Sequence, residues 1–165
     1  MSIFKKILRV FFTILATRKI GGYKTKPFIG FYSRFTQNTF LGNNCNFNGM
    51  VIRGFGKVEI GDNFHSGKQC LIINTYHKYD NGNAIPYDTN EVINKDVIIE
   101  DNVWIGDRVL VLGGVTIGEG AIIQAGAVVV NNIPKYAIAG GNPAKVFKYR
   151  NIENYERLKS ENKFI

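Results

Sequence analysis

The chain has 165 residues, the length of one domain, and 45% of them are apolar, which argues against a disordered chain. Its 18 glycines are too many for a helical protein and indicate frequent tight turns. The formal net charge of +8 favours an anionic partner, although lysines that only aid solubility give the same total. Aromatic and basic residues do not interleave as in nucleic-acid-binding modules, so no nucleic acid is expected.

The first predicted element is a basic amphipathic helix within residues 1–22. Its apolar run, Val10 to Ala16, is shorter than the roughly 20 residues that span a bilayer. A signal peptide begins similarly, but Arg18 and Lys19 stand where small neutral cleavage residues belong. One side of the helix is apolar and its surroundings are basic: Ile3, Ile7, Val10, Phe11, Ile14 and Leu15, with Lys5, Lys6, Arg9, Arg18 and Lys19. The pattern fits a helix in a membrane interface, or one packed on its own domain or on a partner subunit.

Residues 23–150 form the predicted main domain, in which apolar residues recur every six positions. The rhythm begins irregularly, with Thr39, Cys45 and Val51, and then Val58, Phe64 and Cys70. Both cysteines occupy these columns, so we expect two small buried thiols in a reducing compartment rather than a disulfide. Two cysteines this far apart do not make a zinc site, and no metal is expected.

The rhythm stops over residues 76–96, which we predict to bulge from the domain as a loop. The segment is rich in Asn, Asp and Tyr, contains Pro86, and displays His77, one of only two histidines. Loops held by a rigid scaffold often carry function, so His77 is the leading catalytic candidate. The other histidine, His65, lies inside a repeat, should point outward, and could line the same cleft.

The period is strictest from Val97 to Asn132, where six hexapeptides read VIIEDN, VWIGDR, VLVLGG, VTIGEG, AIIQAG and AVVVNN. The first and third positions are apolar in every copy, and the last is mostly glycine or asparagine. Alternating apolar residues indicate short strands, and glycine or asparagine indicates turns. Short strands and turns with this period predict an all-β fold, a parallel β-helix with apolar columns inside.

The last segment, residues 151–165, predicts a short polar helix or a tail. Its Ile152, Tyr155 and Leu158 could pack on the last coil. No function is inferred from it.

The stretch DNVWIGDRVLVLGGVTIGEGAIIQAGAVVVNNIPKYAIAGGNPAKVFKYR, Asp101 to Arg150, resembles the hexapeptide-repeat acyltransferases, in particular the maltose, galactoside and polysaccharide O-acetyltransferase branch. The similarity covers about residues 39–150, including the spacing from IGDN at Ile60 to His77. The resemblance implies a left-handed β-helix, acetyl-CoA as cosubstrate, and a homotrimer with active sites between neighbouring subunits. It also implies acetyl transfer to a sugar hydroxyl in surface-polysaccharide synthesis, in the cytoplasm or on the inner face of the membrane.

The resemblance places His77 where the family has its catalytic base. Imidazole is well matched to taking a proton from a hydroxyl near neutral pH. Asn74, Asp80 and Asn81 are the candidates to orient it, and the sequence does not choose among them. Asn46 matches an asparagine that contacts the acceptor in related sugar acetyltransferases, and a turn asparagine fits it equally well. Trp104 could flank the acceptor or the pantetheine arm, or pack in the interior.

The resemblance also implies a coenzyme A groove along the prism. The Gly106–Asp107 segment would offer a backbone N–H to the thioester oxygen, although many relatives have a serine in place of Asp107. The other matched positions, with the lysines near the nucleotide, are Gly114, Ala125, Gly126, Val130, Asn131, Lys145 and Lys148. The run VVVNN replaces a common VVTKD, so one phosphate contact of the family is missing or replaced.

Other functions give weaker fits. An N-acetyltransferase of an amino sugar nucleotide is the main alternative, but such relatives often carry an extra N-terminal domain, for which 165 residues leave no room. An antibiotic acetyltransferase would share fold and base. A β-helix carbonic anhydrase needs three histidines for each metal, and this chain has two. An ice-binding or scaffold solenoid predicts rows of threonine, whereas Thr116 stands almost alone in the repeats.

Overall fold

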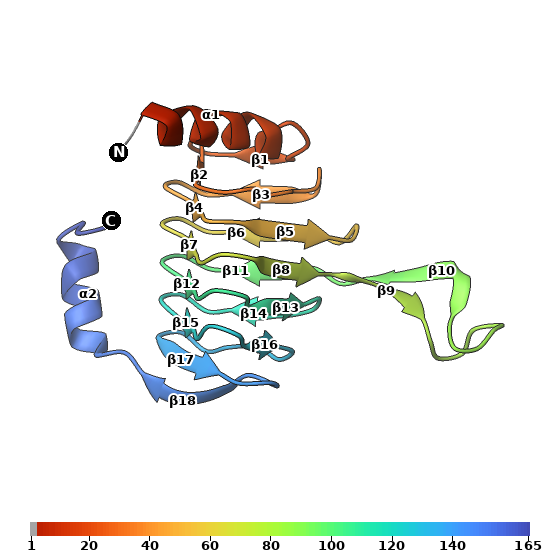
Figure 1. Cartoon of the computed structure of the whole chain (residues 1–165). Coiled ribbons are helices and arrows are strands. Elements are labelled where there is room, and N and C mark those ends of the chain that lie inside the picture. The colour runs from red at the N-terminus through yellow and green to blue at the C-terminus, as the bar shows by residue number, and fades with distance from the viewer. Residues whose placement is uncertain (1–2) are drawn as a thin grey trace.

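A computed structural model describes residues 3–165 of the chain. Of the predicted 1–22 segment, Met1, Ser2 and the side chains of Phe4 and Lys5 lie outside the description. Short strands stack in successive coils to form a three-sided prism, with helix α1 (Ile3–Thr17) across one end and helix α2 (Ile152–Ser160) beside it (Figure 1). The predicted parallel β-helix is therefore confirmed.

The prism has three faces, which we name by their number of strands. The five-stranded face contains β1 (Gly22–Tyr23), β3 (Thr39–Leu41), β6 (Val58–Ile60), β11 (Val97–Ile99) and β14 (Thr116–Ile117). The four-stranded face contains β5 (Met50–Arg53), β8 (Cys70–Ile73), β13 (Leu110–Leu112) and β16 (Val128–Val129). The seven-stranded face contains β2 (Phe28–Ile29), β4 (Asn46–Phe47), β7 (His65–Ser66), β12 (Trp104–Ile105), β15 (Ile122–Ile123), β17 (Ala137–Gly140) and β18 (Lys145–Tyr149). The strands pair in parallel within each face, except that β18 runs antiparallel to β17.

The interior of the prism is made by the two predicted columns. Each member of both columns is buried: Val97, Val103, Val109, Val115, Ala121 and Ala127, and Ile99, Ile105, Val111, Ile117, Ile123 and Val129. Toward α1 the interior becomes aromatic, with the ring of Phe47 lying 4.9 Å from that of Phe35 and 5.2 Å from that of Phe64. Burial of apolar side chains in every coil is what holds this thin stack together.

The chain turns between strands at the last position of the hexapeptides. Gly114, Gly120 and Gly126 have φ of 89°, 69° and 75°, and Asn102 and Arg108 have φ of 59° and 56°. Glycine and asparagine tolerate this left-handed region best, which explains their recurrence there. Arg108 adopts the same left-handed conformation, although arginine disfavours it. The stacking of the coils therefore outweighs the backbone preference of arginine at this turn.

Both cysteines are buried and free, as the column positions predict. Burial raises the pKa of the Cys45 thiol and of the Cys70 thiol to about 11. The thiolate is the reactive form, so these residues act as small packing groups rather than as nucleophiles.

The segment predicted as a loop is a β-hairpin instead. Strand β9 (Thr75–Lys78) pairs antiparallel with β10 (Asp88–Asn94), with an irregularity in register between Asp88 and Val92. The hairpin leaves the prism where β8 ends and projects sideways from the middle of the stack (Figure 1). The prediction that this segment protrudes is therefore right, and the prediction that it is a loop is wrong for the residues of β9 and β10.

Candidate active site

His77 lies at the base of this hairpin. It belongs to β9, is paired with Val92 of β10, and its exposed ring stacks on that of Tyr87 at 4.4 Å and 16°. The backbone before it is tied to the prism, because the Tyr76 hydroxyl accepts the Gly113 N–H at 2.6 Å and donates to the Ile73 carbonyl at 3.1 Å. Strand β9 is thus tied to the prism one residue before its imidazole.

Asn74 does not stand beside His77 as an orienting group. Its side chain has no exposed surface, and its amide donates to the Gly56 carbonyl at 2.7 Å inside a turn. This burial commits Asn74 to the fold and argues against the expectation that it orients His77. Asp80 and Asn81 are exposed in the connection between β9 and β10, so they remain accessible candidates.

The carboxylate that shapes the hairpin is Asp88, which the sequence reasoning missed. It is buried and accepts the N–H groups of Asn83 at 3.0 Å and Asn90 at 2.9 Å. These two backbone hydrogen bonds lower the pKa of Asp88, because they favour its ionised form. The run Asp88-Thr-Asn, typical of an Asp-initiated turn, was the available signal.

A second group of expected site residues lies on the seven-stranded face. Asn46, His65 and Trp104 are register partners on neighbouring strands, and the Asn46 amide nitrogen lies 3.4 Å from the His65 Nε2 atom. Trp104 is 54% exposed, so it is not interior packing. His65, Trp104 and Lys148 line one groove of about 710 Å³ between this face and α2, whereas Lys145 is exposed elsewhere on β18.

The remaining expected cofactor residues divide between two edges of the four-stranded face. Gly106, Asp107, Ala125 and Gly126 lie in the turns that enter this face from the seven-stranded one. Gly114, Val130 and Asn131 lie at the exit from the four-stranded face, on the edge that carries the hairpin and His77. The structure therefore separates the candidate residues into two sets rather than gathering them in one place.

The Asp107 turn offers an open backbone donor. A carboxylate oxygen of Asp107 accepts the N–H of Lys68, the residue stacked on it in the previous coil, at 2.7 Å. In the next coil the stacked residue is Ala125, which has no carboxylate to do the same for Asp107. Among residues 3–165, no acceptor pairs with the Asp107 N–H. A free N–H in a rigid turn is the kind of group that can stabilise an oxyanion.

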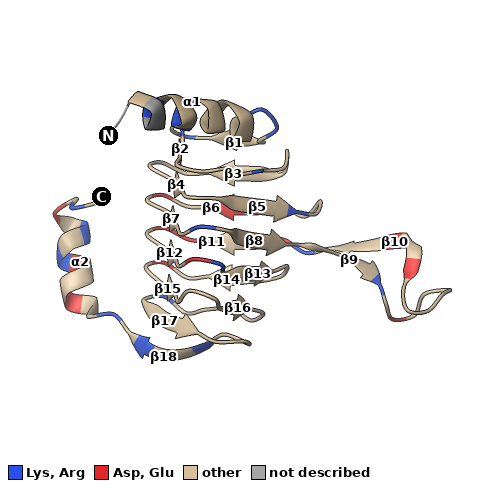
Figure 2. Cartoon of the chain, viewed as in Figure 1, with Lys and Arg blue, Asp and Glu red and all other residues tan. Residues whose placement is uncertain are grey.

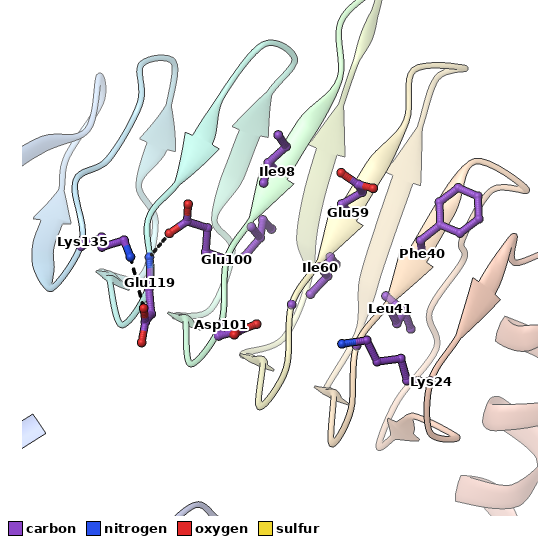
Figure 3. Close-up of a pocket in the computed structure, with 13 residues that line it drawn as sticks. Lys24, Phe40, Leu41, Glu59, Ile60, Ile98, Glu100, Asp101, Glu119 and Lys135 are labelled. Atoms are coloured by element: carbon purple, nitrogen blue, oxygen red, sulfur yellow. Dashed lines mark hydrogen bonds and ion pairs between the residues drawn. The ribbon is translucent and has the colours of Figure 1, made fainter. Parts of the chain in front are cut away.

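A further groove of about 440 Å³ lies on the five-stranded face (Figure 3). Four carboxylates line it together with two lysines: Glu59, Glu100, Asp101 and Glu119, with Lys24 and Lys135. This lining contains none of the expected site residues. Its acidic balance would repel a phosphorylated cofactor.

Glu119 joins this groove to α2. Burial alone would raise the pKa of Glu119. The carboxylate accepts hydrogen bonds from the ammonium groups of Lys159 and Lys135 and, at 3.1 Å, from the Tyr155 hydroxyl. These hydrogen bonds hold the pKa of Glu119 below its usual value. The ionised carboxylate thereby fixes α2 against the prism. It thereby also holds in place the α2 wall of the other groove, the one of about 710 Å³ that Trp104 lines.

Known proteins share both the repeat and the fold. The family model described as bacterial transferase hexapeptide (six repeats) matches residues 96–131. A Saccharomyces cerevisiae protein named as an acetyltransferase is 35% identical over 79% of this chain and 67% of its own length. A Schizosaccharomyces pombe protein named likewise is 38% identical over 76% of this chain and 56% of its own length. The chain thus spans little more than half of that relative.

Two solved structures are also similar. A galactoside acetyltransferase in complex with coenzyme A has a TM-score of 0.61 at 26% identity, covering 85% of this chain and 64% of the other. A maltose O-acetyltransferase from Clostridium difficile 630 has a TM-score of 0.65 at 26% identity, covering 90% of this chain and 89% of the other. The fold and the repeat together define a β-helix protein of the hexapeptide-repeat class. The chain belongs to the hexapeptide-repeat acetyltransferase family.

Proposed function

We propose that the chain is an acetyl-CoA-dependent O-acetyltransferase that acts on a sugar hydroxyl, in the synthesis of a surface polysaccharide in the cytoplasm. The observation that carries the proposal is the pair of groups that acetyl transfer requires: an exposed imidazole at His77 and an open backbone donor at Asp107. His77 stands on hairpin strand β9, which Tyr76 ties to the prism, and Asp107 stands in a turn of the coils. The solved relative that contains coenzyme A supports the choice of cosubstrate.

In the proposed reaction, His77 takes the proton of the acceptor hydroxyl as its oxygen attacks the thioester carbonyl carbon. The carbonyl oxygen becomes an oxyanion and receives a hydrogen bond from the Asp107 N–H. The carbon–sulfur bond then breaks, and the imidazolium of His77 returns its proton to the departing thiolate. An acetyl ester and free coenzyme A result. Trp104 and Lys148 would line the approach of the acceptor and of the cofactor phosphates.

One chain does not bring these groups together. Asp107 stacks on Lys68, which precedes β8, whereas His77 follows β8. A strand of four residues spans about 13 Å, but a base must lie within about 3 Å of the proton that it removes. We therefore propose a homotrimer, in which the His77 edge of one subunit meets the Trp104 and Asp107 region of its neighbour.

The direct test is thiol release from acetyl-CoA against a panel of sugars, amino sugars, sugar nucleotides and glycans. We expect turnover with a hydroxyl acceptor and a product that mild base cleaves, because esters are labile and amides are not. A product stable to base would identify an amino group as the acceptor. Absence of thioester consumption with every acceptor would contradict the proposed activity.

A further inference from the structure

Helix α1 closes the end of the prism with only one of its sides. Thr13 and Ala16 are buried against the first coil, and the ring of Phe12 lies 5.6 Å from that of Phe31. The guanidinium of Arg9 lies 3.9 Å from the centre of the Phe28 ring. The helix is therefore fixed to its own domain, and its rotation about its axis is set by these contacts.

The opposite side of α1 is apolar and uncovered. It presents a stripe of side chains that are 40–78% exposed: Ile3, Ile7, Val10, Phe11, Ile14 and Leu15. Their spacing of three and four residues places them on one face of the helix. We call this stripe the outward face of α1. Figure 1 shows that α1 lies across the end of the stack, so this face points away from the coils. No helix among residues 3–165 is long and apolar enough to cross a membrane.

The positive charge of the chain is concentrated at the same end. No Asp or Glu precedes Glu59, whereas ten Lys and Arg residues do. The rest of the chain holds eleven Lys and Arg against all thirteen Asp and Glu. In Figure 2 the charged segments at the α1 end are all blue (Lys and Arg), and red segments (Asp and Glu) begin further along the stack. The prism is thus polarised along its axis, with its excess of cations toward the α1 end.

We propose that the α1 end docks on an anionic lipid surface, with the outward face of α1 in the interface. Apolar side chains flanked by cations match acyl chains beneath acidic headgroups, and an interfacial helix buries its apolar side by about 5–10 Å. A second copy seated end to end would bring two cationic ends together with no carboxylate between them. The proposed trimer packs through the sides of the prisms, so its three α1 helices lie at one end and can bind the same surface together. Only this gain in affinity from three linked helices rests on the proposed function.

The test is co-sedimentation of the full chain with phosphatidylcholine vesicles, with and without phosphatidylglycerol. We expect binding to the mixed vesicles at least about tenfold stronger than to the neutral ones, and weaker at high salt. The double variant Ile7→Gln/Phe11→Gln should lower vesicle binding about tenfold or more. Each substitution removes apolar area that docking would bury in the lipid interface. Phe55→Gln is the matched control, since it removes an aromatic ring that is 69% exposed in the turn before β6.

Each of these proteins is also assayed for mass in solution and for thiol release from acetyl-CoA without vesicles. Unchanged mass and turnover in the double variant, with lost vesicle binding, would support docking. If the double variant dissociates, the outward face is covered by another copy, and the proposal is overturned. Equal binding of wild type to both vesicles, or to neither, also overturns it. Vesicle binding without acetyl transfer would refute only the proposed activity.

Discussion

Replacing His77 with Asn is expected to lower kcat for acetyl transfer by about 10²–10⁴-fold, the contribution of a positioned general base. Asn keeps a polar side chain of similar reach but cannot accept a proton at neutral pH. Because His77 is exposed and its ring contacts only that of Tyr87 among the aromatic residues described, folding should be unaffected. The measurement is thiol release at saturating acetyl-CoA, with Tm recorded alongside.

His65→Asn provides the matched control for this experiment. His65 lies on the seven-stranded face in contact with Asn46, where it can line the acceptor groove but is not the proposed base. We expect a less than tenfold loss of kcat in this variant. The role of His77 would be contradicted if His77→Asn kept more than about a tenth of wild-type kcat, or if His65→Asn were the more damaging change.

Replacing Phe64 with Ala should destabilise the fold by about 3–5 kcal/mol, as removal of a fully buried phenylalanine does. Phe64 has no exposed surface, and its ring lies 5.2 Å from that of Phe47 in the aromatic part of the interior. The smaller side chain leaves a cavity between coils that are too tightly hydrogen-bonded to collapse around it. The measurement is denaturant unfolding followed by circular dichroism at one fixed protein concentration.

The control is Phe55→Ala, which removes the same ring from the surface. Its effect should stay within about 0.5 kcal/mol, as for most surface substitutions. Equal losses for the two variants would mean that the apolar columns do not carry the stability of the prism.

Much of the fold could be predicted because one physical rule repeats in every coil. The first and third positions of each hexapeptide must be apolar to fill the interior, so the period appears directly in the sequence. The hairpin obeys no such rule. Of the residues in β10, only Asp88 is buried, and the register is irregular after it, so no apolar alternation marks the strand. Its pairing comes from backbone hydrogen bonds and the Asp88 turn.

The candidate site could be predicted by residue but not by arrangement. Asn74 and His77 are neighbours in sequence, yet one side chain turns into the prism and the other away from it. The open N–H of Asp107 depends on Ala125, one full coil later, and this relation appears only when coils are stacked. Likewise, the apolar stripe of α1 was visible in the sequence, but its outward direction depends on Phe12 and Arg9 meeting Phe31 and Phe28.

The most direct test of the account is complementation between His77→Asn, which removes the proposed base, and Trp104→Ala, which removes a proposed acceptor contact, unfolded together and refolded as mixed trimers. If each site takes its base from one subunit and its Trp104 side from the neighbour, about a quarter of the sites in an equal mixture regain both groups. We predict that thiol release with the identified acceptor rises to about this fraction of wild-type turnover. Activity that stays at the sum of the two separate variants would contradict a site shared between chains.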